Sequence, residues 1–96
     1  MKRSNQRSLA EAMADMVESL GLREKLDEQA LLAAWDHVAG PMIARHTTRL
    51  RFRAGVLRVK VDSAPLRHEL GYQKDVLLGQ LNEHLGRAVV HTIALD

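Results

Sequence analysis

Residues 49–60 read RLRFRAGVLRVK, and this stretch decides the fold because two runs of alternating side chains flank Ala54-Gly55. Successive side chains of a β-strand point to opposite faces of the sheet. Leu50 and Phe52 therefore share one face of the first strand, and arginines occupy the other face. With Ala54-Gly55 as the turn, the stretch predicts a β-hairpin whose apolar face covers a core and whose charged face meets solvent.

Five cations share the charged face of this predicted hairpin, and no acid interrupts them. The second strand continues the apolar alternation, which brings Arg58 opposite Arg51 and Lys60 opposite Arg49. Like charges directly across a strand pair destabilise a sheet, so a partner outside the hairpin is expected to offset them. The five cations are Arg49, Arg51, Arg53, Arg58 and Lys60.

The amino-acid composition limits which classes of protein this chain can belong to. The 96 residues fit one small domain, and 46% hydrophobic with 27% charged residues is typical of a folded globular chain. The absence of cysteine excludes disulfides and thiolate metal sites and suits a reducing cytoplasm. Acids interrupt the residues that follow the N-terminus, so neither a signal peptide nor a membrane span is predicted.

Charge is segregated along the chain. Residues 1–7 carry a net charge of +3, residues 8–36 carry −5, residues 37–61 carry +6 and residues 62–96 carry −2. We therefore divide the chain into a basic leader at 1–7 and a single domain at 8–96. The positive part favours a polyanionic partner, and the negative part allows a separate basic partner.

An amphipathic helix is predicted over residues 9–20. Ser8 and Glu11 have the spacing of a capping box, and Gly21 provides a stop. The polar side carries three acids, for which two interpretations stay open: a solvated face, or a docking surface for a basic partner. These acids are Glu11, Asp15 and Glu18.

Two further helical segments surround the hairpin. One spans residues 27–39 and ends at Gly40-Pro41, after which the segment PMIARH has the pattern of one more short turn. The other begins near Pro65 and changes phase at Gly71, so it is either one kinked helix or two short helices. Gly86 ends this segment.

A last strand is predicted over residues 89–95, with His91 on its apolar alternation as a hydrogen-bonded core histidine. The resulting order is α-α-β-β-α-β. It predicts an α+β fold, in which helices cover one face of a three-stranded sheet and leave the arginine face open. A right-handed crossover is expected to bring the last strand beside the first strand.

A series of residues along most of the chain resembles the DciA family. The likeness covers about residues 9–96 and rests on the order and spacing of the whole series rather than on any single motif. The series comprises Trp35, Val38-Ala39-Gly40, Ile43-Ala44, His46-Thr47, Leu57, Val59, Val61, Ser63, Glu69-Leu70, Leu81-Asn82 and Leu85-Gly86.

The resemblance implies a fold similar to that of K-homology (KH) domains. It also implies that the protein binds the bacterial replicative helicase DnaB, takes part in loading it, and has affinity for DNA. Many family members carry a disordered arm that engages the helicase. For this sequence, which ends at Asp96, the contact is expected from the folded domain or the basic leader. KH domains clamp nucleotides with a GxxG loop. The corresponding residues 71–74 read GYQK, so that clamp is not expected.

The five-cation face has three interpretations: a surface that follows phosphates, a solubilising surface that protects an edge strand, or a docking site for an acidic protein. Trp35 and Phe52 fall on predicted core faces, so the sequence shows no aromatic surface for base stacking. The expected mode is therefore recognition of the phosphate backbone of single-stranded or forked DNA, without base readout. Further cations assigned to this interface are Arg45, Lys2, Arg3 and Arg7.

Trp35 lies on an apolar stripe and is interpreted as a core anchor, with an exposed partner contact as the alternative. The five histidines show no metal-ligand spacing. No nucleophile elbow, glycine-rich phosphate loop or Walker-type lysine is present. The prediction is therefore a protein that is not an enzyme and that uses no cofactor, metal or small-molecule substrate.

The function predicted on these grounds is a cytoplasmic, nucleoid-associated replication factor that binds DnaB and assists its loading on DNA. Two alternatives stay open. One is a small RNA-binding module without a helicase contact. The other is a protein-binding adaptor whose basic face meets an acidic partner.

Overall fold

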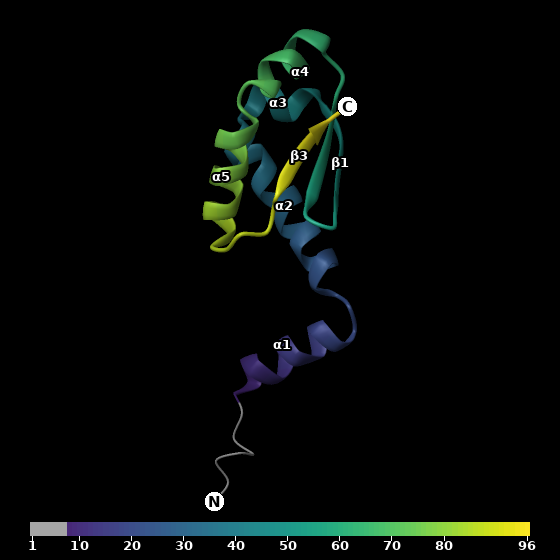
Figure 1. The fold of residues 1–96 in the computed structure, drawn as a ribbon, viewed down its shortest axis with the longest axis vertical. Coiled ribbons are helices and arrows are strands. Elements are labelled where there is room, and N and C mark those ends of the chain that lie inside the picture. The colour runs from purple at the N-terminus through teal and green to yellow at the C-terminus, as the bar shows by residue number, and fades with distance from the viewer. Residues whose placement is uncertain (1–7) are drawn as a thin grey trace, which may run out of the picture.

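The computed structural model describes residues 8–96, so the basic leader at residues 1–7 lies outside the described part of the chain. The described part is an α+β domain with a three-stranded mixed sheet (Figure 1). Its elements are α1 (Leu9–Ser19), α2 (Arg23–Ala39), α3 (Pro41–His46), β1 (Thr47–Arg53), β2 (Val56–Val61), α4 (Ala64–Gly71), α5 (Lys74–Leu85) and β3 (Thr92–Leu95).

This order is consistent with the predicted α-α-β-β-α-β arrangement. The short turn expected at PMIARH is α3. The helix that changes phase at Gly71 is the pair α4 and α5, so two short helices meet there rather than one kinked helix. Helix α2 begins at Arg23, four residues before its predicted start at residue 27.

The hairpin has the predicted turn and register. Ala54 and Gly55 both adopt positive φ, at 50° and 80°. Positive φ at both central residues belongs to the turns whose twist matches that of the flanking strands. Arg51 pairs with Arg58 and Arg49 pairs with Lys60 across the strands.

The last strand, predicted beside the first strand, lies instead beside β2. The sheet order is β1-β2-β3, and β3 runs parallel to β2. The outer edge of β1 is closed by α2, because Glu28 Oε2 accepts a hydrogen bond from the Phe52 N–H at 2.8 Å and Glu24 Oε2 accepts one from the Ala54 N–H at 2.7 Å. Two carboxylates therefore occupy the outer edge of β1, where the last strand had been predicted to pair.

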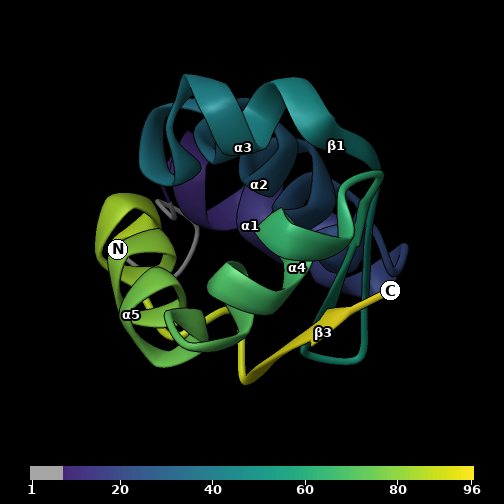
Figure 2. The same ribbon diagram turned by 90° about the horizontal axis from the view of Figure 1, so that it is seen from above.

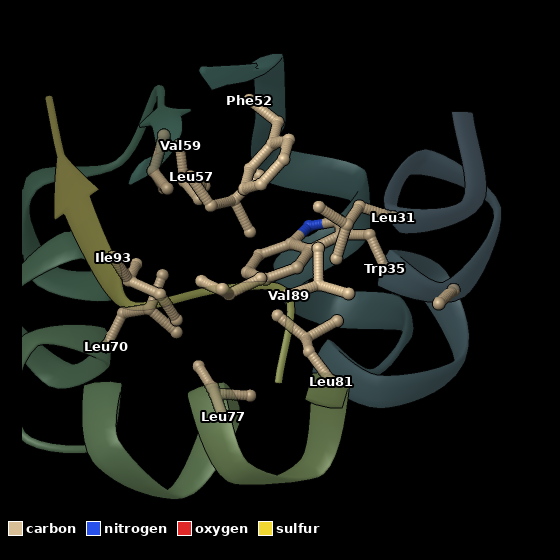
Figure 3. Close-up of a cluster of buried hydrophobic side chains, with 13 residues drawn as sticks. Leu31, Trp35, Phe52, Leu57, Val59, Leu70, Leu77, Leu81, Val89 and Ile93 are labelled. Carbon is tan, nitrogen blue, oxygen red and sulfur yellow. The ribbon is translucent and has the colours of Figure 1, made fainter. Parts of the chain in front are cut away.

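The core lies between the sheet and helices α2, α4 and α5. In Figure 2 the hairpin lies on one side of the domain and α5 on the opposite side. Figure 3 shows side chains from both layers converging on Trp35. The buried apolar residues are Leu31, Ala34, Trp35, Phe52, Leu57, Val59, Val61, Leu70, Leu77, Leu81, Val89, Val90 and Ile93.

Trp35 anchors this core. Its side chain is 1% exposed, and its Nε1–H donates a hydrogen bond to Thr47 Oγ1 at 3.0 Å. The Thr47 hydroxyl in turn donates to the Ile43 carbonyl at 2.7 Å, which ties α3 to the start of β1. The core-anchor interpretation is confirmed. Assignment of Trp35 as an exposed partner contact is corrected, because the ring packs between the helices and the sheet.

The segment that leads into β3 is held by the side chain of Asn82. Its Oδ1 accepts hydrogen bonds from the N–H groups of Val89 and Val90 at 2.9 and 2.8 Å, and its Nδ2–H donates to the Val90 carbonyl at 2.9 Å. An ion pair between Arg87 and the buried Asp27 joins the same segment to α2. These contacts set where β3 begins and so where its side chains face.

His91, predicted in the core, is exposed. Regular pairing of β3 begins one residue later, at Thr92. The His91 N–H donates to the Gly55 carbonyl at 2.8 Å, and the ring lies so close to Gly55 that a Cβ there would approach His91 Cδ2 to 2.5 Å. His91 therefore covers the hairpin turn instead of entering the core.

Helix α1 projects away from the sheet, beyond the turn of the hairpin (Figure 1). The predicted capping box is present, since the Glu11 N–H donates to Ser8 Oγ at 3.1 Å and the Ser8 N–H donates to Glu11 Oε1 at 3.0 Å. No residue of α1 is buried. The amphipathic pattern predicted a helix correctly, but its apolar side does not join the domain core.

Candidate nucleic-acid interface

The five predicted cations lie on the sheet face that the helices leave uncovered. All five are exposed, whereas the alternating residues Phe52, Leu57 and Val59 are at most 7% exposed. A single alternation therefore produces both the core face and a charged face. We call the following residues the basic face: Arg49, Arg51, Arg53, Arg58 and Lys60.

A hollow of about 520 Å³ opens on the basic face. It is lined by the five cations together with Phe52 and Asp96, whose side chains carry a summed charge of +4. Within residues 8–96, none of the five cations forms an ion pair with an acid. The hollow thus concentrates positive potential on a solvent-facing surface, and this favours an anionic ligand.

Cross-strand pairing makes the basic face electrostatically costly without a ligand. Arg51 faces Arg58, and Arg49 faces Lys60. Two like charges about 5 Å apart repel by about 1 kcal/mol at the dielectric of water, and by more near a protein surface. Phosphate groups placed between these side chains replace the repulsion with attraction.

Asp96 is the acid of the hollow, and sequence reasoning missed it. Its N–H donates to the Val59 carbonyl at 2.9 Å, and its carbonyl accepts from the Val61 N–H at 3.4 Å. These two bonds flank Lys60, so Asp96 lies beside Lys60 across the parallel strands. The alternation that predicted a buried Ile93 also indicated that Asp96 faces outward. Without the order of the strands in the sheet, that signal could not place Asp96 among the cations.

Of the other cations predicted for the interface, the structure describes Arg45, and Arg45 does not line the hollow. Arg45 is exposed in the last turn of α3, just before β1. Lys2, Arg3 and Arg7 lie outside the described residues. The described structure therefore brings together the hairpin cations and leaves Arg45 at the periphery.

The histidines join neighbouring elements. His46 Nδ1 lies 2.8 Å from Asp62 Oδ1, next to the ends of β1 and β2. The rings of His37 on α2 and His84 on α5 have centroids 5.5 Å apart. Within residues 8–96, no group of three or more histidine, aspartate or glutamate side chains is placed to hold a metal ion.

A family model described as "Dna[CI] antecedent, DciA" matches residues 8–95, which is nearly the whole chain. The chain belongs to the DciA family. Membership implies a role in DNA replication, in the loading of the replicative helicase DnaB. No curated protein matches the chain significantly. In the described part of this DciA-family chain, no helix is long and apolar enough to cross a membrane.

Residues 71–74, which the sequence resemblance aligned with the GxxG loop of KH domains, span the turn between α4 and α5 of this DciA-family chain. Here α4 ends at Gly71 and α5 begins at Lys74. Tyr72 in the turn is 77% exposed, and its hydroxyl lies 3.1 Å from His68 Nε2. Among residues 8–96, Phe52 is the one aromatic side chain that lines the basic hollow, and it is 7% exposed. The described lining of the hollow therefore presents positive charge rather than a stacking surface.

Glu11 and Glu18, two acids on α1 of the DciA-family domain, contact neighbouring residues. Glu11 completes the capping box with Ser8. Glu18 Oε2 accepts a hydrogen bond from Arg23 Nε at 2.8 Å, and this bond raises the pKa of the Arg23 guanidinium. The Glu18–Arg23 pair spans the turn between α1 and α2 and links the two helices.

The opposite side of α1 presents an exposed apolar stripe. Its members recur at positions i, i+4, i+7 and i+11, so they lie along one side of the helix, away from the acids. Contiguous exposed apolar surface of this kind marks interaction sites in soluble proteins. The stripe consists of Leu9, Met13, Met16 and Leu20, which are 76%, 56%, 59% and 63% exposed.

Proposed function

We propose that this chain binds the replicative helicase DnaB and DNA together and so assists loading of the helicase. In this proposal the basic face holds a DNA strand by its phosphates, and the apolar stripe of α1 contacts the helicase. The protein then acts in the cytoplasm, at the nucleoid. It contributes binding and positioning to the loading step, while the chemistry of nucleotide hydrolysis belongs to the helicase.

The observation that carries DNA binding is the hollow, where, within residues 8–96, five cations without an ion pair meet one acidic side chain. Such a surface neutralises phosphates and releases their counterions, which provides affinity without base readout. The nearly buried Phe52 in the lining favours the same mode, because binding by base stacking needs exposed aromatic rings.

The helicase contact is supported by the exposure of the α1 stripe together with family membership. An amphipathic helix commonly docks its apolar side into a groove of its partner. Glu11, Asp15 and Glu18 lie on the other side of α1 and then face solvent or a basic rim of that groove. Because α1 buries none of its residues, it can be altered without disturbing the core.

Two double variants separate the functions. Met13→Glu with Met16→Glu is expected to lose retention of DnaB in a pull-down and to keep single-stranded DNA binding. Arg51→Glu with Arg58→Glu is expected to do the reverse. Met42→Glu is the control, since Met42 is 57% exposed on α3 and lies outside both surfaces. Wild-type protein that binds total RNA more tightly than single-stranded DNA, and that does not retain DnaB, contradicts the proposal.

A further inference from the structure

Asp96 stands out among the residues of the hollow because its charge opposes that of every other titratable group in the lining. Both backbone polar groups of Asp96 are engaged with β2, and its carbonyl also accepts a hydrogen bond from Arg67 Nη1 at 3.3 Å. Its side-chain carboxylate forms no ion pair with any cation that the structure describes. An acceptor is thus held at one margin of a basic surface.

The strand order places the Asp96 carboxylate on one defined side of the basic face. The basic face occupies β1 and β2, and Asp96 follows β3 on the other side of β2. Residues of β3 that share the open face, Thr92 and Ala94, are uncharged, and Ala94 lies beside Arg58. Phosphates are attracted to the β1 and β2 side and repelled by Asp96. This arrangement favours a bound single strand whose phosphates lie over the cations and whose bases lie toward β3.

An ionised carboxylate only accepts hydrogen bonds. Cytosine presents an exocyclic amino donor at the position where uracil and thymine present a carbonyl acceptor, and adenine and guanine also carry amino donors. We propose that Asp96 gives the basic face a preference for bases with an exocyclic amino group over uracil or thymine. This inference rests on the proposed DNA binding, and it adds a choice of base type to recognition that is otherwise based on phosphates.

The test compares oligo-dC with oligo-dU of equal length, because these ligands share a backbone and differ at the base edge. Fluorescence anisotropy at slightly alkaline pH is expected to show that wild-type protein binds oligo-dC about two- to tenfold more tightly, the range of one net hydrogen bond. Asp96→Ala is expected to bring this ratio to about one. The same variant is expected to bind oligo-dU more tightly than wild type, because a repulsive charge is gone and no hydrogen bond is lost.

Controls separate base recognition from charge. Asp75→Ala removes an exposed acid in the first turn of α5, outside the hollow, and is expected to keep the wild-type ratio. Asp96→Asn restores an acceptor together with a donor, and its ratio is expected to fall between those of the wild type and Asp96→Ala. The oligo-dC to oligo-dU ratio is also expected to persist as salt rises, while both affinities fall.

Two results overturn the inference. Equal binding of both ligands by wild-type protein refutes the role of Asp96 and leaves the proposed DNA binding intact. A preference that survives Asp96→Ala places base selection at another residue. If wild-type protein binds neither ligand, the proposed DNA binding fails together with this inference, so the two failures are distinguishable.

Discussion

Reversal of one cross-strand pair tests the basic face most directly. Arg51 and Arg58 face each other in the middle of the hairpin, and both line the hollow. Arg51→Glu with Arg58→Glu changes the summed side-chain charge of the hollow lining from +4 to 0. Phosphate binding then loses its electrostatic basis, so the double variant is expected to show no measurable binding of single-stranded DNA.

The magnitude follows from the number of cations. Each neutralised phosphate of a single strand contributes about −0.7 to the slope of log affinity against log salt, so five cations predict a slope of about −3 to −4. A slope of this size weakens wild-type binding about 100-fold between 50 and 200 mM salt. Fluorescence anisotropy with a labelled oligonucleotide, titrated across this range, measures both the slope and its loss.

Folding of the double variant is expected to stay intact. The substituted side chains are exposed, and the packing of Phe52, Leu57 and Val59 on the other face is untouched. Glutamates at these two positions also meet arginine or lysine neighbours along each strand. The free energy of unfolding should therefore change by no more than about 0.5 kcal/mol, or rise, as denaturant titration would show.

Arg23→Glu with Lys25→Glu is the matched control, because it reverses two cations of α2 that lie outside the hollow. It should bind single-stranded DNA nearly as well as wild type. The opposite pattern, in which the α2 variant loses binding while the hairpin variant retains it, refutes the assignment of the nucleic-acid surface to the sheet.

Three further predictions concern the core, the start of β3 and catalysis. Trp35→Ala should lower the free energy of unfolding by about 3–5 kcal/mol in denaturant titration, because it empties the centre of the core; a loss below 1 kcal/mol contradicts the anchor role. Asn82→Ala should cost about 2–4 kcal/mol in the same assay, since it removes the acceptor of the Val89 and Val90 N–H groups. Purified protein should show no ATPase or nuclease turnover with or without divalent metal, and turnover that co-purifies with the chain through every column refutes this.

Local sequence patterns were sufficient to predict those features that depend only on residues close together in the chain. The alternation in RLRFRAGVLRVK predicted the hairpin, its register and the separation of Phe52 from the arginines, because a strand has only two faces. Ser8 and Glu11 predicted the start of α1, because a capping box involves residues three positions apart. The cations of the candidate site were predictable for the same reason.

Contacts between distant segments were decided by the tertiary structure. The alternation of residues 89–95 predicted a strand but not its neighbour, and the neighbour depends on Glu24 and Glu28 of α2, which close the edge of β1. His91 left the predicted core because pairing starts one residue later, at Thr92. Periodicity along a chain does not encode which edge of a sheet remains open.

The sequence by itself therefore determined the hairpin, the helices and the positive face, because these depend on side-chain alternation and turn geometry within short stretches. Only the tertiary structure decided that Asp96 lies in the hollow and that the apolar stripe of α1 stays outside the core. An amphipathic helix has the same pattern whether its apolar side meets its own core or another protein. Its burial depends on the surfaces that the rest of the fold brings against it.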